Sequence, residues 1–333
     1  MFTKSSVGYL GVIISGLIIL GVEDTGLIGQ SAPPEEGKNI FEEEVKAKIV
    51  EQEMILIKSG SFIRGTKELD KLSDEEKENY MGEINETPQY TVALKAFYID
   101  KYEVTNLMYK KFVDETKYQP PKHWVEGVIP LGLENHPVVY VSWNDAVEYA
   151  KWAKKRLPTE AEWERVARGL KGQIYPWGDE FDKLKCRNAF SKVRSTCEVN
   201  EYPDGKSPDG CYQMAGNVWE WVADRYDWRY YKRDPRNDPR KKDPRPDTDP
   251  TGPLDTEVTY ICEDHGPQSN AEGNCPVENC GKPLKVTEKF PERVIRGGSW
   301  SDGSADLRCA KRSAYPPDYN SFRIGFRCAR DAE

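Results

Sequence analysis

The chain has 333 residues, with 48 Lys and Arg against 56 Asp and Glu, which gives a formal net charge of −8. This acidic balance argues against a nucleic-acid-binding protein, because binding to phosphate backbones needs a concentrated basic surface. Hydrophobic residues make up 38% of the chain, which excludes wholesale disorder. With three histidines in all, a site built from several histidines is excluded, whereas the eight cysteines need an explanation.

An uncharged apolar segment, residues 7–22, lies close to the N-terminus behind Lys4. Its 16 residues exceed the apolar core of most signal peptides and fall short of the ~20 residues of a membrane helix. Small residues after the segment offer a cleavage region, so residues 1–32 are predicted to be a signal peptide or an N-terminal membrane anchor. A buried helix of the globular domain is the alternative. Both export predictions place the body outside the cytoplasm, in the periplasm or another extracytoplasmic space where disulfides persist.

Residues 33–53 are predicted to form a charged linker that contains a short helix. Phe41, Val45 and Ile49 recur at helical spacing, and the opposite face carries mixed charges. We interpret this segment as a spacer between the membrane and the domain.

The pattern of a globular domain begins at Met54. Apolar and alternating segments predict four strands, at residues 55–57, 60–65, 90–94 and 97–100. The polar residues 66–85 predict a loop between the second and third strands.

Three helices are predicted beyond these strands, each behind a residue that favours helix N-termini. The first follows Thr105, the second follows Ser142, and the third follows Thr159. Glu162 stands three residues after Thr159, the spacing at which the two side chains satisfy each other's free backbone amides.

Six motifs occur in order between about Met54 and Ala329. They are HPVVYVSW (136–143), RLPTEAEWE (156–164), YPWG (175–178), MAGNVWEW (214–221), RGGSW (296–300) and IGFRC (324–328). Together they resemble the formylglycine-generating enzyme (sulfatase-modifying factor) superfamily. The resemblance implies one α+β domain over residues 54–331, with the irregular formylglycine-generating-enzyme fold: a C-type-lectin-like core low in regular secondary structure.

The resemblance also implies a chemistry for which this chain lacks residues. The family's oxidase converts a cysteine of a sulfatase into formylglycine with a copper-binding pair of cysteines after the Arg-Gly-Gly-Ser-aromatic motif, because thiolates bind copper(I) well. In this chain Asp302 stands at the position of the first copper-binding cysteine. The stretch that follows is about three residues shorter, so the position of the second cysteine is absent. Cys309 matches a later cysteine of the family, which is structural. We therefore predict no catalytic residues.

The absent cysteine pair predicts a non-catalytic binding or assembly subunit of an extracytoplasmic complex. The alternative is a formylglycine-generating-type oxidase, or another family enzyme, that acts on a protein substrate by a variant mechanism. The related iron-dependent sulfoxide synthases use a three-histidine iron site in a separate helical domain. The three histidines here, at positions 123, 136 and 265, do not supply such a site.

The segment after the Arg-Gly-Gly-Ser-Trp motif forms the exposed binding surface in lectin-like and variable receptor proteins of this fold. The candidate ligand surface of this chain consists of Trp300, Asp302, Asp306, Tyr315, Asp318 and Tyr319. Aromatic and acidic side chains bind peptides or sugars, although such loops also form ordinary polar surface. A protein or peptide partner is expected, nucleic acid is not, and residues 7–22 would provide any membrane anchoring.

The resemblance implies calcium as a cofactor, an ion that takes six to eight oxygen ligands. The first family site matches Gln213, Gly216, Val218 and Glu220, of which the middle two supply backbone carbonyls. Gln213 departs from the usual Asp or Asn, and Glu220 has an alternative role as a helix-start or salt-bridge residue. A second family site would use Asn188 and the carbonyl of Ala189, but its Asp partner is missing from a shortened stretch.

Two segments interrupt the domain. Residues 232–248 contain Asp-Pro-Arg three times and predict an extended, solvated loop, whereas residues 255–290 form a cysteine-containing insert. The insert holds three thiols and an imidazole that suit a tetrahedral zinc site: Cys262, His265, Cys275 and Cys280.

The insert resembles a small heavy-metal-binding ribbon found beside copper and heavy-metal transport proteins. That ribbon ends in Cys-Pro-x-Cys, whereas this chain has Cys-Pro-Val-Glu-Asn-Cys, with two more residues between the cysteines. A metal would staple a segment with almost no core, so a structural role is expected for the zinc. A disulfide between two of these cysteines is the alternative, since the compartment is oxidising.

Five cysteines remain, at positions 186, 197, 211, 309 and 328. Family disulfides link the region after the Pro-Trp-Gly motif to the Arg-Cys-Ala stretch, so the resemblance implies the pair Cys186 and Cys309. Cys197 with Cys211 is the next predicted pair, although connectivity cannot be deduced from sequence.

Overall fold

The computed structural model describes residues 50–68, 71–73, 82–232, 248–252, 258–262, 266–268, 280, 282, 285–288 and 292–332. All of them belong to the second of two units, Lys48–Glu333. Within these ranges no helix is both long enough and apolar enough to cross a membrane. The predictions for residues 1–32, for most of the linker and for nearly all of the Asp-Pro-Arg loop lie outside the described residues.

The four predicted strands at the start of the domain are confirmed. They are β1 (Met54–Ile57), β2 (Gly60–Arg64), β3 (Tyr90–Leu94) and β4 (Phe97–Asp100). Strands β2 and β3 pair antiparallel, whereas β1, β4 and the C-terminal β12 (Ala329–Asp331) form a three-stranded antiparallel sheet with β4 in the middle. The two ends of the described domain therefore meet in one sheet.

A four-stranded central sheet gathers the later sequence motifs. Its strands, in spatial order, are β10 (Arg312–Tyr315), β9 (Arg293–Arg296), β5 (Trp219–Arg225) and β11 (Ile324–Phe326). Strand β11 runs parallel to β5, and the other neighbours pair antiparallel. The motifs after residues 214, 296 and 324 thus lie side by side although they are far apart in sequence.

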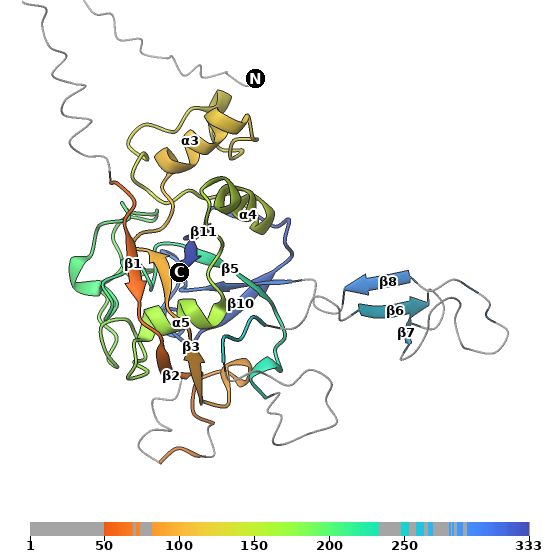
Figure 1. Cartoon of the computed structure of the whole chain (residues 1–333). Helices are drawn as coiled ribbons and strands as arrows, with labels where there is room; N and C mark the ends of the chain where they lie inside the picture. The colour runs from red at the N-terminus through yellow and green to blue at the C-terminus, as the bar shows by residue number, and fades with distance from the viewer. Residues whose placement is uncertain are drawn as a thin grey trace, which may run out of the picture. The chain divides into compact units, whose positions relative to one another are not determined.

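The three predicted helices are confirmed together with their N-caps. They are α3 (Asn106–Thr116), α4 (Trp143–Trp152) and α5 (Glu160–Arg168). The Thr159 hydroxyl accepts from the Glu162 amide at 3.2 Å, and the Glu162 carboxylate accepts from the Thr159 amide at 2.8 Å. Figure 1 shows α3 and α4 next to each other, and both pack on the apolar cluster that includes β11.

The remaining regular structure is short. It consists of the 3-10 turns η2 (Ile84–Glu86), η3 (Val125–Gly127), η4 (Pro203–Gly205) and η5 (Tyr230–Lys232), and of the insert strands β6 (Val258–Cys262), β7 (Gly266–Gln268) and β8 (Lys285–Glu288). The insert strands form an antiparallel sheet with β6 between the other two. Few helices and several small irregular sheets confirm the predicted α+β class.

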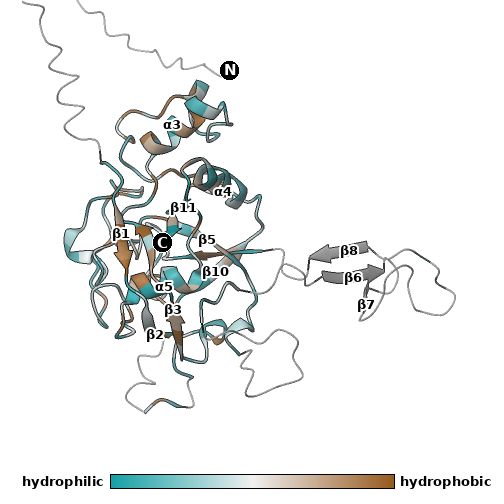
Figure 2. Ribbon diagram, viewed as in Figure 1, coloured by the Kyte–Doolittle hydropathy of each residue, from teal (hydrophilic) through white to brown (hydrophobic). Residues whose placement is uncertain are grey.

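Helix α5 is unusual because it is both charged and buried. Figure 2 draws β1 in hydrophobic and α5 in largely hydrophilic colours, yet all nine residues of α5 are buried. Its Trp163 and Val166 join an apolar cluster with strands β2 and β3, while its acidic side chains need partners from elsewhere. The centre of the domain therefore contains ion pairs as well as apolar contacts.

Candidate functional site

A small polar cavity of about 180 Å³ lies against one face of the central sheet. Each strand of the sheet contributes to its floor: Trp219 from β5, Ile295 from β9, Ser313 and Tyr315 from β10, and Ile324 from β11. Two loops form its walls, with Asp302, Asp306 and Lys311 on one side and Tyr319, Ser321 and Arg323 on the other. The volume is below the 300 Å³ or more of typical ligand pockets, so the cavity can accept one side chain or a very small ligand.

The structure brings together four of the six residues predicted as a ligand surface. Asp302, Asp306, Tyr315 and Tyr319 line the cavity. The rings of Tyr315 and Tyr319 are stacked, with centroids 4.2 Å apart and planes at 12°. Trp300 contacts the ring of Phe322 at 5.8 Å, and Asp318 is exposed without lining the cavity.

Asp302 occupies the position of the first copper-binding cysteine implied by the resemblance, and its carboxylate is held in place. Oδ2 accepts from Trp219 Nε1 and the Ser299 amide, both at 2.9 Å, and from the Ser299 hydroxyl at 2.5 Å. Oδ1 lies 3.8 Å from Nη1 of Arg323. The loop is thus fixed by a hard oxygen ligand where copper(I) chemistry needs a soft thiolate.

No thiol lines the cavity among the residues that the structure describes. Cys309 is the cysteine closest to Asp302 in sequence. It is fully buried, and its carbonyl accepts from Arg296 Nη2 at 2.8 Å. Burial raises the pKa of its thiol to about 12, so the group remains a neutral core side chain.

The predicted disulfide between Cys186 and Cys309 does not form in the structure, where both are free thiols. Cys186 packs with Tyr175 and Leu307, and its sulfur lies 3.4 Å from Asn188 Nδ2, whereas Cys309 belongs to the apolar cluster around α5. The two side chains belong to different apolar clusters, although both lie near Tyr175. The second predicted pair, Cys197 with Cys211, is also free.

An aromatic strip lies beside the cavity, and its members other than Trp300 were not predicted from the sequence. We define it as His123, Tyr140, Phe322 and Trp300, whose successive ring centroids lie 4.9, 6.2 and 5.8 Å apart. The four residues come from separate loops, so no periodicity could reveal them. One local feature marks the strip: Tyr140 has a φ of 58°, a left-handed conformation that is strained for an aromatic residue.

Glu220, predicted as a calcium ligand, makes a buried salt bridge. Its carboxylate accepts from Nε and Nη2 of Arg327, each at 2.7 Å, and from Trp163 Nε1 at 2.9 Å. Arg327 is fully buried and also donates from Nη2 to the Tyr212 carbonyl at 2.7 Å. The salt-bridge role considered for Glu220 is therefore present.

A second buried carboxylate, Glu103, lies near Glu220 and was missed by the sequence interpretation. Its Oε2 accepts from Asn217 Nδ2 at 2.6 Å, but its Oε1 has no hydrogen-bond partner among the described residues. Burial and the nearby charge of Glu220 raise the pKa of Glu103 well above its ordinary value. Gln213 Oε1 is likewise buried without a described partner. The carboxylates of Glu103 and Glu220 and the amide oxygen of Gln213 are hard oxygen donors of the kind that calcium takes.

The residues of the second predicted calcium site are used for local structure. Asn188 Nδ2 donates to the carbonyls of Lys183 and Cys186, at 2.8 and 2.9 Å, and its Oδ1 accepts from the Phe190 amide at 2.9 Å. The Ala189 amide donates to the Asp302 carbonyl at 3.0 Å. In the described ranges no three His, Cys, Asp or Glu side chains converge on one point. The second calcium site remains a prediction.

The predicted zinc set cannot be assembled from the described part of the chain. Cys262 is the last residue of β6, where it pairs with Gly266 of β7. His265 and Cys275 lie outside the described residues, and Cys280 is an isolated described position. The zinc site and its disulfide alternative both remain predictions.

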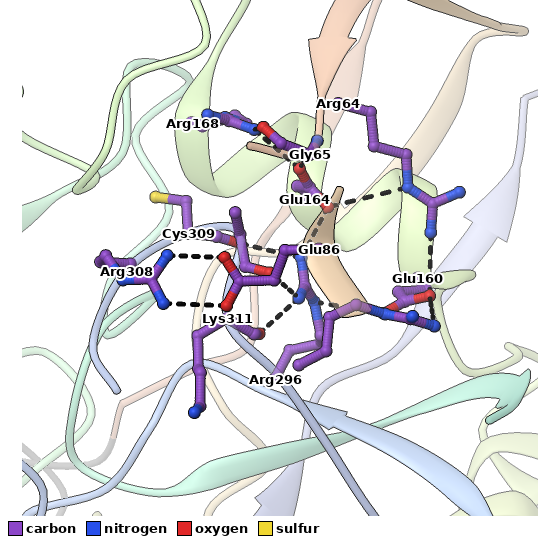
Figure 3. Close-up of polar contacts among 12 residues, drawn as sticks. Arg64, Gly65, Glu86, Glu160, Glu164, Arg168, Arg296, Arg308, Cys309 and Lys311 are labelled. Carbon is purple, nitrogen blue, oxygen red and sulfur yellow. Dashed lines mark hydrogen bonds and ion pairs between the residues drawn. The ribbon is translucent and has the colours of Figure 1, made fainter. Parts of the chain in front are cut away.

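Buried ion pairs hold α5 to the sheets behind the cavity (Figure 3). Glu164 accepts from Arg296 Nη2 at 2.7 Å, and Glu160 accepts from Arg64 Nη2 at 2.9 Å and from Arg312 Nε at 2.6 Å. Burial opposes ionisation of Glu160, but Arg312, Arg64 and Arg296 lower its pKa to about 2. These contacts are internal and stabilising, since none of the five side chains is more than marginally exposed.

One ion pair fixes the loop that carries the cavity wall. Arg308 binds Glu86 in a two-point contact, with Nη1–Oε2 at 2.6 Å and Nη2–Oε1 at 2.8 Å (Figure 3). Lys311 pairs with Glu83 and, at 3.1 Å, with Asp306 of the cavity. The cavity is therefore built on rigid supports on the side of residues 302–311.

Residues 41–332 match the model of the family described as "Sulfatase-modifying factor enzyme 1-like domain". The formylglycine-generating enzyme of Streptomyces coelicolor is 34% identical over 306 residues, which cover 74% of this chain and 82% of that protein. A mouse protein named "Inactive C-alpha-formylglycine-generating enzyme 2" is 29% identical over 335 residues, 84% of this chain and 86% of its own.

A protein of Chlamydia caviae named "Serine/threonine-protein kinase pkn1" is 32% identical over 304 residues. The match covers 86% of this chain but only 39% of that relative, so the chain spans about two fifths of its length. Among solved structures, PvdO from Pseudomonas aeruginosa superposes with a TM-score of 0.58 at 24% identity, over 84% of this chain and 94% of PvdO. These matches confirm the formylglycine-generating-enzyme type of fold.

Proposed function

The chain belongs to the family of sulfatase-modifying factor enzyme 1-like domains, and from this premise we propose that it is a non-catalytic, exported member of the family that binds a protein or peptide partner as a subunit of an extracytoplasmic complex. The observation that carries the proposal is Asp302, whose carboxylate is fixed by Trp219 and Ser299 where the oxidase would need a thiolate. The name of the mouse relative describes an inactive protein within the family. Export rests on the apolar residues 7–22.

What remains at this place is a binding surface on rigid supports. The cavity offers charges of both signs, two stacked tyrosines and a polar floor, and the aromatic strip extends from its edge. Such a surface can hold a partner without any reactive group. Cys309 does not supply one, because it is buried away from the cavity wall.

We expect no aldehyde when the purified protein is incubated aerobically with copper(I) and a cysteine-containing sulfatase peptide. The reason is that no described thiol faces the cavity and an oxygen ligand replaces the first cysteine. Aldehyde would be measured by oxime formation and mass spectrometry. The enzyme of Streptomyces coelicolor is the matched positive control, and aldehyde above the copper-only background would refute the non-catalytic assignment.

We also propose a structural calcium ion held by Glu103, Glu220 and Gln213 with the carbonyls of Gly216 and Val218. Support comes from the unpaired buried oxygens of Glu103 and Gln213 and from the raised pKa of Glu103, since a cation would relieve both. Calcium would supply positive charge to two buried carboxylates whose shared counter-charge in the described structure is Arg327. The ion would hold the loop before β5 against the start of α3.

Calcium should therefore raise the free energy of unfolding by about 2.7 kcal/mol when its free concentration is 100 times Kd, and the melting temperature should rise with it. Scanning calorimetry with calcium and with EDTA measures the shift, and elemental analysis measures the bound ion. Glu103→Gln should abolish the calcium dependence, whereas Glu148→Gln on the surface of α4 should leave it intact. Equal melting temperatures with calcium and EDTA would contradict the proposal.

A further inference from the structure

We propose that the partner segment bound at this face is an acidic peptide with apolar or aromatic side chains, which lies across the aromatic strip and places one carboxylate in the cavity. The inference rests on the proposed binding function and specifies the chemistry of its partner. It is carried by two cations, Lys122 and Arg323, that stand on neighbouring rings of the strip.

Both cations lie against aromatic faces. The ammonium of Lys122 is 5.1 Å from the ring centroid of Tyr140, and the guanidinium of Arg323 is 5.7 Å from that of Phe322. The two rings are themselves 6.2 Å apart. Cation–π contacts of this kind hold a positive charge at an apolar surface while leaving its outward side available.

Neither cation is neutralised by a short ion pair within the described structure. No described carboxylate lies within 4 Å of the Lys122 ammonium, and the nearest to Arg323 is Asp302 at 3.8 Å, beyond hydrogen-bond distance. Arg323 makes one described side-chain hydrogen bond, from Nη1 to the Ser301 hydroxyl at 3.1 Å. Arg308, by contrast, is saturated by both oxygens of Glu86.

Arg323 is placed to meet a ligand because it lines the cavity. Its side chain is 36% exposed, and most of its donor fork is unused. A carboxylate fits such a fork with two parallel hydrogen bonds, the strongest geometry available to arginine. The stacked Tyr315 and Tyr319 would flank the stem of the entering side chain.

Exposed apolar side chains follow Lys122 in the same loop, which favours hydrophobic residues beside the acidic ones in the peptide. The loop that carries Lys122 exposes Val125, Val128 and Leu131, the last of these at 98%. Phe322, in the facing loop, is also exposed. Exposed apolar side chains that gather beside polar groups mark protein-binding surfaces.

The two loops are joined, so the surface is presented as one unit. The Tyr140 amide donates to the Ser321 carbonyl at 2.9 Å, which fixes Tyr140 in its left-handed conformation beside Phe322. Asn320 Oδ1 and both ring nitrogens of His123 have no hydrogen-bond partner among the described residues.

The test uses a fluorescein-labelled peptide, Gly-Glu-Phe-Asp-Tyr-Glu-Phe-Gly, and the full chain. Two matched probes replace the three acidic residues with lysine or the three aromatic residues with serine. Fluorescence anisotropy should show binding of the first peptide and at least tenfold weaker binding of both others. The affinity should fall with rising salt, because the contacts are exposed charges.

The double variant Lys122→Gln with Arg323→Gln should weaken binding of the acidic peptide at least tenfold. Lys95→Gln with Lys151→Gln is the control, since both side chains are exposed and line a separate pocket, outside the cavity and strip. Melting temperatures of all variants verify that they are folded. Phe322→Ala tests the apolar part separately and should also weaken binding.

Three results would overturn the inference. In the first, the lysine peptide binds as tightly as the acidic peptide, and Phe322→Ala still abolishes this binding. That result would keep the binding face but reject an acidic partner. Binding of a neutral oligosaccharide such as maltoheptaose, without binding of peptides, would make the ligand a sugar. No binding of any peptide at 1 mM would reject peptide recognition here, whereas the non-catalytic assignment fails only if aldehyde forms.

Discussion

Replacing Glu164 with glutamine should lower the free energy of unfolding by about 3–5 kcal/mol, although the two side chains have the same shape. Glu164 Oε1 accepts from the Gly65 amide at 2.7 Å and from Arg168 Nη1 at 2.8 Å, and Oε2 accepts from Arg296 Nη2 at 2.7 Å and Tyr231 at 2.9 Å. All four donors point at one fully buried carboxylate, and Figure 3 labels three of them, Gly65, Arg168 and Arg296.

The expected loss comes from the groups left behind. Glutamine offers one acceptor oxygen and turns an NH₂ group toward donors, so at least one guanidinium remains buried without its counter-charge. Burial opposes ionisation of Glu164, but Arg296, Arg168 and Arg64 lower its pKa, so the carboxylate is charged at neutral pH. Removing one partner of a buried ion pair is far more costly than exchanging the whole pair for apolar residues.

Urea denaturation followed by circular dichroism measures the effect. Glu148→Gln is the matched control, because Glu148 pairs with Lys151 at 2.7 Å on the surface of α4 and should contribute about 0.5 kcal/mol or less. Similar losses for the two variants would show that the ion pairs around α5 contribute no more than surface pairs do.

Local features of the fold could be predicted from the sequence because their causes are local. The N-cap hydroxyls of Thr105 and Thr159 accept amides three residues on, and the strands β1 to β4 follow short apolar runs. Neighbours in sequence were sufficient for these predictions. Asp302, Asp306 and Tyr315 were instead chosen from the family resemblance, and the structure places all three at the cavity.

The burial of α5 could not be predicted, because its charged residues give the pattern of an exposed helix. The arginines that neutralise it come from β2, β9 and β10, at positions 64, 296 and 312. The same limit hid Glu103 and the aromatic strip apart from Trp300, because their members meet only through loop packing. The pairing of Cys186 with Cys309 came from the family resemblance and is not formed in the structure, where the two thiols belong to different apolar clusters.

Asp224→Asn should stabilise the protein at neutral pH, by up to roughly 4 kcal/mol at 1.36 kcal/mol per pKa unit. Asp224 Oδ2 accepts from the Glu160 amide at 2.7 Å, and Oδ1 is buried without a partner in the described structure. Burial, and after it the charge of Glu160, raises the pKa of Asp224 from 3.8 to about 7. The asparagine oxygen can still accept the Glu160 amide, so the substitution removes the charge and retains the contact.

The direction of the pH dependence follows from proton counts. Between about pH 4 and 7 the folded protein keeps a proton on Asp224 that the unfolded chain has lost, so stability falls as the pH rises through this window. Glu160 does not interfere above pH 5, because its lowered pKa removes stability only as the pH falls from 4.5 toward 2. Asp224→Asn should therefore already be more stable than the wild type at pH 5, and the difference should grow up to about pH 7 and level off above it.

Denaturation curves at pH 5, 6, 7 and 8 measure this divergence. Asp114→Asn is the control, since Asp114 forms an exposed pair with Lys110 on α3 and should shift all four values equally. Parallel curves for Asp224→Asn and the wild type would mean that Asp224 carries the same charge in the folded and unfolded states. In that case the arginines around Glu160 would offset the burial of this third carboxylate fully, and the core would be neutral as a unit.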